Sequence, residues 1–108
     1  MTKKFVKLNY SNVENYYRSK KLFKGALVRY RFSHNTILTY GLDAEEETWK
    51  IGIVSDVNWY VFRRPPSSYM IETTDKELIC YDLTVHPTDQ IGTEMINLES
   101  NEIFLLTD

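Results

Sequence analysis

The side chains best suited to covalent chemistry are few and lie far apart in the sequence. Cys80 is the single cysteine, and His34 and His86 are the two histidines. Cys80 and His86 would be about 20 Å apart in an extended strand, too far for a nucleophile and its general base to share a hydrogen bond. We therefore expect Cys80 to be a buried structural residue, and we predict that the protein is not an enzyme.

The candidate ligands for a metal or cofactor are equally sparse. Asp43 and the run of glutamates at 45–47 offer oxygen ligands for a hard cation such as Ca²⁺ or Mg²⁺. The run lacks the alternating Asp or Asn ligands and the central glycine of a calcium-binding loop, so a solvated acidic loop is favoured. The four glycines are dispersed, which argues against a phosphate-binding loop. We predict no metal and no cofactor.

The charge distribution is the most informative feature of the sequence. Residues 1–31 hold nine of the 13 basic residues and one acidic residue, whereas residues 32–108 hold four basic and 14 acidic residues. A basic segment on an acidic body favours an acidic partner, and a second copy of the chain would qualify. The alternative is that the basic segment folds back onto its own body and the charges cancel locally. The sequence leaves both interpretations open.

The first candidate binding site is this basic N-terminal arm. Its candidate contact residues are Lys3, Lys4, Lys7, Arg18, Lys20 and Lys21. Together with the nearby Tyr10, Tyr16 and Tyr17, they would also suit nucleic acid, because cations neutralise phosphates and aromatic rings stack on bases. The acidic body and a pI of about 5.7 argue against that alternative.

The second candidate site follows the second tryptophan. Its candidate contact residues are Trp59, Tyr60, Phe62, Arg63 and Arg64. Tryptophan, tyrosine and arginine are the commonest anchors of protein interfaces, and here they precede a Pro65–Pro66 pair that cannot occupy a central strand. We expect residues 58–66 to form a loop at which a protein partner binds. The alternative is that Trp59 completes the core, as we expect Trp49 to do.

The N-terminal segment has the signals of a short helix. Ser11 and Glu14 match a capping box, in which a serine accepts a hydrogen bond from the third helical N–H and the glutamate bonds back. The spacing of the apolar residues that follow predicts a helix over residues 12–21. Residues 5–8 are expected to form a short extended segment before it.

The rest of the chain has the pattern of short strands joined by turns. Aromatic residues make up 14% of the chain, which favours strands. Residues 26–32 alternate between apolar and polar, and residues 51–57 form a second predicted strand in which Gly52 marks a bulge or a close approach. Residues 33–48 are expected to form a long polar loop. Further strands are predicted at 69–73, 78–85, 95–98 and 103–106, with turns at 74–77, 86–89 and 99–101.

Three segments carry a resemblance to a known family. Residues 24–30 (KGALVRY), 49–57 (WKIGIVSDV) and 101–106 (NEIFLL) resemble the strands of the small SH3-like barrels of tailed phages and bacteria. The resemblance covers residues 24–106 and rests on generic motifs. It implies a mainly β protein, a small SH3-like β-barrel of five or six strands over residues 25–108, preceded by a basic arm and short helix over residues 1–24.

The resemblance and the surface chemistry together give a functional expectation. We expect a non-enzymatic module for protein–protein binding or assembly, encoded by a phage and acting as a virion structural or accessory component. The partner would be another protein or neighbouring copies of the chain. Binding of nucleic acid through the basic arm is one alternative, and inhibition of a host protein is another. The sequence has no apolar run long enough for a signal peptide or a membrane span, so we expect a soluble, cytoplasmic protein.

Overall fold

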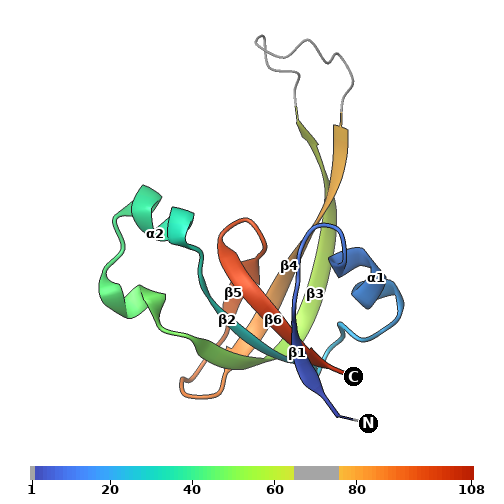
Figure 1. The fold of residues 1–108 in the computed structure, drawn as a ribbon, viewed down its shortest axis with the longest axis horizontal. Helices are drawn as coiled ribbons and strands as arrows, with labels where there is room; N and C mark the ends of the chain where they lie inside the picture. Colours follow the sequence, from blue (N-terminus) through green and yellow to red (C-terminus); the bar gives the residue numbers. More distant parts are fainter. Residues whose placement is uncertain (1, 65–75) are drawn as a thin grey trace.

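The computed structural model describes residues 2–64 and 76–108, and these form one six-stranded antiparallel sheet (Figure 1). The strand order in the sheet is β1-β6-β2-β3-β4-β5. The strands are β1 (Lys4–Lys7), β2 (Leu27–Phe32), β3 (Lys50–Arg64), β4 (Lys76–Pro87), β5 (Glu94–Asn97) and β6 (Asn101–Thr107). The helical elements are α1 (Val13–Arg18), α2 (His34–Tyr40) and the 3₁₀ turn η1 (Ala44–Glu47).

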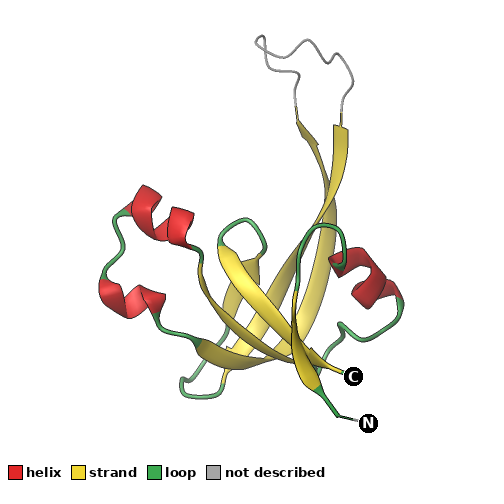
Figure 2. Cartoon of the chain, viewed as in Figure 1, coloured by secondary structure: helices red, strands yellow, loops and turns green. Residues whose placement is uncertain are grey.

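The prediction of a mainly β protein is confirmed. The sheet is strongly curved in Figure 2, but it is not a closed barrel, because β1 and β5 are its two end strands. A short β1 with two lysines and a four-residue β5 are usual for edge strands, which would otherwise invite pairing with other chains. The structure therefore supports the β class and leaves the SH3-like barrel as a prediction.

The core lies on one face of the sheet. The alternation predicted for residues 26–32 is confirmed, because Val28 and Tyr30 are buried whereas Arg29 and Arg31 are half-buried on the other face. Leu105 pairs with Val28, and Ile103 pairs with Tyr30, so β6 contributes the facing apolar residues. Each fully buried aliphatic side chain stabilises the fold by about 1.5–3 kcal/mol. The buried core also includes Val54, Leu83, Val85 and Ile96.

Gly52 is a point of close approach, as predicted. A Cβ atom at this position would lie 3.0 Å from the carbonyl oxygen of His86 and 3.2 Å from Cε1 of Tyr30. The strand therefore needs glycine here so that the Tyr30 ring can pack across β3. The register shift of the β3–β4 ladder is not at Gly52 but between Val54 and Asp56.

The N-terminal helix exists, but the predicted capping box is wrong. Asn12 is the N-cap residue and makes no side-chain capping bond. The turn is instead organised by Asn9, whose Oδ1 accepts hydrogen bonds from the Ser11 N–H, the Ser11 hydroxyl and the Asn12 N–H. The helix ends at Arg18, three residues before its predicted end, and Lys20 then adopts a left-handed backbone with a φ of 61°.

The basic N-terminal segment folds back onto the rest of the chain. β1 pairs with β6 over residues 4–7, and the Leu8 N–H continues this ladder by donating to the carbonyl of Ile103. Leu8, Val13 and Leu22 are buried in the same core as the sheet residues. The arm is therefore part of the sheet and of its core.

The predicted long loop over residues 33–48 is wrong, because this segment contains α2 and η1. The Ser33 hydroxyl accepts a hydrogen bond from the Thr36 N–H, which caps the start of α2. Gly41 ends the helix in the left-handed conformation that favours glycine. Asp43 then caps η1 by accepting from the Glu45 N–H. Only Thr36 and Ile37 of α2 are buried, so the segment lacks the apolar periodicity that would have revealed a helix.

The long β3–β4 ribbon also differs from the prediction. Residues 58–64 are not a loop but continue β3, and they pair with β4 up to Arg64↔Lys76. Figure 1 shows this ribbon extending away from the rest of the sheet. His86 and Pro87 belong to β4 rather than to a turn. The predicted Pro65–Pro66 turn, the predicted strand at 69–73 and the first half of the predicted turn at 74–77 lie outside the described residues.

The final hairpin follows the prediction closely. β5 and β6 are joined by a turn at residues 98–100, and Asn97 Oδ1 accepts from the Ser100 N–H within it. Asn101 Oδ1 in turn accepts from the Asn97 N–H.

In the described part of the chain, no helix is long and apolar enough to cross a membrane.

Candidate binding site

Two neighbouring clefts collect most of the cations predicted for the arm. The first has a volume of about 280 Å³ and lies beside the paired chain ends, where β1 brings Lys3 next to the last residues of β6. Lys20 and Lys21, which follow α1, line its opposite wall together with Phe23. The apolar part of the wall comes from Leu27 and Leu106.

The second cleft, of about 380 Å³, lies on the other side of Phe23. Arg18, Lys20 and Lys24 contribute its cations, and Tyr17 contributes an aromatic ring. Because the two clefts share Lys20 and Phe23, we treat them as one surface, the basic cleft. Its charged and aromatic members are Lys3, Tyr17, Arg18, Lys20, Lys21, Phe23, Lys24 and Asp108.

The local fold explains why these side chains face solvent. The N–H groups of Lys21 and Leu22 both donate to the carbonyl of Tyr16, so the chain turns sharply at the end of α1. Leu22 is buried and anchors this turn, which leaves its neighbours on the outside. Phe23 is 50% exposed, an unusual position for a large aromatic side chain surrounded by lysines.

Asp108 is the one acidic side chain among the described residues that line the basic cleft, and it forms no ion pair with the cleft lysines. Among the described residues, Lys3, Lys20, Lys21 and Lys24 make no ion pair. Arg18 does pair with Glu14, at 2.7 Å and four residues apart on α1. A solvent-exposed pair of this kind contributes only about 0.3–0.5 kcal/mol and leaves Arg18 available for other contacts.

The remaining two arm residues do not line the basic cleft. Lys4 is exposed on β1, and Lys7 Nζ lies 3.7 Å from a carboxylate oxygen of Glu102. The structure therefore brings together four of the six predicted arm residues, Lys3, Arg18, Lys20 and Lys21, and separates the other two. Lys24 and Phe23 were not among the predicted contacts. The signal for both was in the sequence, since Phe23 is flanked by lysines in the run KKLFK.

The second predicted site lies on the β3–β4 ribbon. Trp59 is 56% exposed and Tyr60 is 42% exposed, and as successive strand residues they face opposite sides of the ribbon. Phe62, Arg63 and Arg64 belong to the same strand by their backbone pairing. A shallow cleft of about 200 Å³ connects Trp59 with Tyr17 and Arg18, so the exposed indole adjoins the basic cleft.

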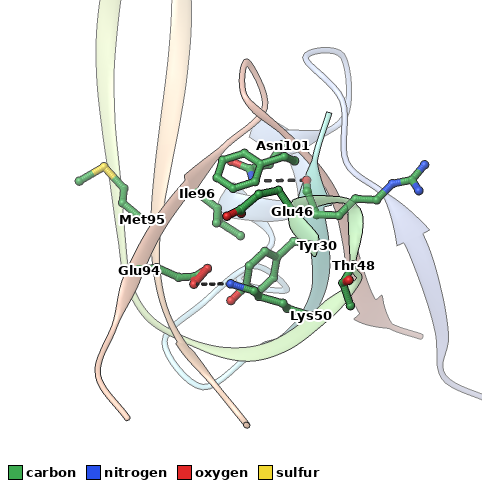
Figure 3. Close-up of a pocket in the computed structure, with 10 residues that line it drawn as sticks. Tyr30, Glu46, Thr48, Lys50, Glu94, Met95, Ile96 and Asn101 are labelled. Atoms are coloured by element: carbon green, nitrogen blue, oxygen red, sulfur yellow. Dashed lines mark hydrogen bonds and ion pairs between the residues drawn. The ribbon is translucent and has the colours of Figure 1, made fainter. Parts of the chain in front are cut away.

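A separate polar pocket of about 260 Å³ lies between the start of β3 and the β5–β6 hairpin (Figure 3). Lys50 Nζ and a Glu94 carboxylate oxygen are 3.2 Å apart in its wall. The buried Tyr30 hydroxyl has no hydrogen-bond partner among the described residues. Burial, and next the negative charge of Glu94, raise the pKa of Tyr30. Because Lys50 and Glu94 form an ion pair with each other, their charges are offset within the fold.

Trp49 lies outside the buried core, contrary to the prediction, and organises the outer face of the sheet instead. The guanidinium carbons of Arg29 and Arg31 lie 4.2 Å and 4.5 Å from the centre of its ring. Phe104 packs edge-on against it, with ring centres 5.4 Å apart. Arg31 also forms an ion pair with Glu102. These arginines are therefore held by aromatic and carboxylate partners of the same molecule.

The residues considered for catalysis and metal binding remain dispersed. Cys80 is half-buried in β4, and the exposed His86 ring nitrogen Nδ1 lies 3.3 Å from the carbonyl of Gly92. His34 is exposed at the start of α2. Over the described residues, no three His, Cys, Asp or Glu side chains come together as metal ligands.

Comparison with known proteins identified no relative. No family model, no curated protein and no solved structure matches the chain.

Proposed function

We propose that the protein is a non-enzymatic binding or assembly module that docks its basic cleft onto an acidic protein surface. The observation that carries this proposal is the group of lysines around the exposed Phe23 that have no ion pair among the described residues. A second copy of the chain is one source of such an acidic surface.

The energetics favour a partner that contacts several of these residues at once. A single exposed ion pair contributes about 0–1 kcal/mol, so one lysine cannot supply a stable complex. Phe23, Leu27 and Leu106 add apolar contact at about 25 cal/mol for each Å² removed from water. The ionic part of the binding would weaken with salt, because the screening length falls from about 10 Å at 0.1 M to about 3 Å at 1 M.

Nucleic acid is the second candidate ligand. Its support is the placement of Tyr17 and Phe23 among the cations of one surface, which suits a phosphate backbone with stacked bases. The pI of about 5.7 argues against it, because nucleic-acid-binding modules are usually strongly basic. The phage and virion roles stay predictions from the resemblance, and inhibition of a host protein stays an alternative that would use the same surface chemistry.

The proposal is tested by comparing two anionic probes. Fluorescently labelled poly-L-glutamate and a mixed-sequence single-stranded oligonucleotide of equal charge number are titrated with the protein at about 50 mM salt, with fluorescence anisotropy as the readout. We expect poly-L-glutamate to bind, and the double variant Lys20→Asn/Lys21→Gln to weaken its binding at least about tenfold.

A matched control variant distinguishes an effect of the charge in the cleft from an effect of the net charge of the protein. The double variant Gln90→Glu/Thr93→Glu has the same net charge as the cleft variant but changes the exposed β4–β5 turn. It should bind poly-L-glutamate nearly as the wild type does. Equal losses in both variants, or no binding of poly-L-glutamate, would overturn the proposal. Tighter binding of the oligonucleotide through the same lysines would favour the nucleic-acid candidate instead.

A further inference from the structure

We infer that the occupant of the basic cleft is the α2–η1 segment, residues 34–47, of a second copy of this chain. The inference rests on the proposed function and makes it specific, because it names both the partner and the segment that binds. Its basis is a match in charge and in exposed apolar side chains between two surfaces of one molecule.

The α2–η1 segment combines acidic and apolar groups that the fold leaves exposed. Leu38 is 67% exposed and Tyr40 is 74% exposed, both on α2. The carboxylates of η1 and its N-cap residue are also exposed, namely Asp43, Glu45 and Glu47. None of these three carboxylates makes an ion pair within the described residues. The segment therefore has the composition expected for an interface that is open in the isolated chain.

The basic cleft offers the complementary groups. Its lysines would pair with the carboxylates of η1, and the apolar surface of Phe23, Leu27 and Leu106 would receive the exposed side chains of α2. Complementary charges steer association and fix its register, while the apolar contacts supply affinity that persists at high salt. Both requirements of a stable contact are thus present on the two surfaces.

The two surfaces cannot meet within one molecule. Figure 1 shows α1 on one side of the molecule and α2 with the 3₁₀ turn on the opposite side. The basic cleft lies at the α1 end, because it is formed by residues of α1 and of the α1–β2 connection. The contact must therefore join two copies.

This geometry also determines the kind of assembly. The cleft of one copy binds a different surface on the next copy, so one such contact leaves one cleft and one α2–η1 segment of the pair free. Such a heterologous contact produces a ring if the rotation between copies closes, and an open string if it does not. A rotation of about 180° would close the ring at two copies, with each cleft holding the segment of the other copy.

The test uses two variants that each lose one side of the contact. Lys20→Asn/Lys21→Gln removes two positive charges from the cleft, and Glu45→Gln/Glu47→Gln removes two negative charges from the segment, in both cases at exposed positions. Light scattering after size exclusion is measured at about 100 µM protein and about 50 mM salt. We expect wild-type dimers or larger species, and monomers for each variant alone.

An equimolar mixture of the two variants is the decisive sample. The glutamate variant contributes an intact cleft, and the lysine variant contributes an intact α2–η1 segment. The mixture should therefore form a 1:1 heterodimer and nothing larger. A mixture that stays monomeric, a wild type that is monomeric, or a variant that still assembles alone would each overturn the inference.

The failure of this inference remains distinct from failure of the proposed function. A monomeric wild type that still binds poly-L-glutamate through Lys20 and Lys21 would show a cleft for another acidic protein. Loss of both assembly and poly-L-glutamate binding would remove the function as well. Leu38→Ser provides the apolar control, since it should weaken assembly also at about 500 mM salt, where screening has already reduced the ionic part.

Discussion

Arg29 and Arg31 on β2 and the lysines of the basic cleft belong to the same basic third of the sequence, yet their surroundings differ. The two arginines stack on Trp49, and Arg31 is paired with Glu102. Lys20 and Lys21 have no ion pair in the described part of the chain and flank an exposed phenylalanine. The two arginines therefore stabilise the sheet, whereas the cleft lysines are available to form ion pairs with a partner.

This difference shows that the charge asymmetry of the sequence combines two contributions. Part of the positive charge is offset inside the fold, as at Lys7 and Arg31, which share Glu102. Most of the remainder lines the basic cleft, whereas Lys4 is exposed on β1 and Arg29 stacks on Trp49. The assignment of stability to one group and binding to the other can be tested by substitutions in each, described next in order of decreasing effect.

The largest effect is expected at Trp49. Trp49→Ala removes the stacking of Arg29 and Arg31 and the edge contact with Phe104. Each cation–π contact is worth about 0.5–1 kcal/mol at such sites, and the aromatic pair adds about 0.5–1.5 kcal/mol. We therefore expect the free energy of unfolding to fall by about 1.5–3.5 kcal/mol, measured by urea denaturation.

Trp59→Ala is the matched control for Trp49. Because Trp59 is 56% exposed on the ribbon, its removal should lower the free energy of unfolding by less than about 1 kcal/mol. Equal losses at the two tryptophans would contradict the division between a structural outer face and an exposed ribbon.

The sequence predicted the strands of the sheet better than the helical segment between β2 and β3. The alternation of residues 26–32 and the glycine at position 52 report local geometry, so β2 and the close approach of β3 could be predicted. Helix α2 could not, because only two of its residues are buried and apolar periodicity reports burial rather than helicity. Its signals were the capping residue Ser33 and the terminal Gly41.

The candidate site was only half predictable for a related reason. The abundance of cations near the N-terminus is visible in the sequence, but their grouping depends on β1 pairing with β6. That pairing places Lys3 beside Lys20 and Lys21, and it directs Lys7 toward Glu102 instead. Such contacts join residues far apart in the chain, and no local pattern encodes them.

The second prediction concerns Glu102, the shared partner of Lys7 and Arg31. Glu102→Gln removes both ion pairs while keeping the size of the side chain. The Glu102 side chain is 28% exposed, so we expect a loss of about 1 kcal/mol in the free energy of unfolding, and a smaller loss at high salt. Urea denaturation at two salt concentrations measures both.

The basic cleft provides the comparison for Glu102. Lys20→Asn/Lys21→Gln should leave the free energy of unfolding unchanged or slightly higher, because these lysines have no ion pair among the described residues. If this variant lost as much stability as Glu102→Gln, the cleft lysines would be structural, and the distinction between the two groups would fail.

The third prediction tests the polar pocket at Tyr30. Tyr30→Phe removes a buried hydroxyl without a hydrogen-bond partner in the described residues, so the free energy of unfolding at pH 7 should change by less than about 1 kcal/mol. A larger loss would show that the hydroxyl is bonded to Glu94, whose charge contributes to its raised pKa.

The same variant has a pH signature with a definite sign. Because the pKa of Tyr30 is raised in the folded state, the unfolded chain releases this proton first, from about pH 10 upward. The wild type therefore loses stability as the pH rises above about 10, and Tyr30 accounts for up to about 1.4 kcal/mol per pH unit of this loss. Tyr30→Phe should show a shallower decline in denaturation experiments between pH 9 and pH 11 (about one unit on either side of the ordinary tyrosine pKa).

The smallest effect on stability is expected at Lys20. Substitution of this residue should change stability and binding in opposite directions. Lys20 has a φ of 61°, a left-handed conformation that costs a lysine about 1–2 kcal/mol and an asparagine less. Lys20→Asn should therefore raise the free energy of unfolding by about 0.5 kcal/mol while weakening the binding of poly-L-glutamate. Urea denaturation and fluorescence anisotropy on the same sample measure the two effects. A lysine kept at a strained position against its own stability is expected where the charge binds a partner. Loss of stability together with loss of binding would instead show that Lys20 holds the cleft in shape.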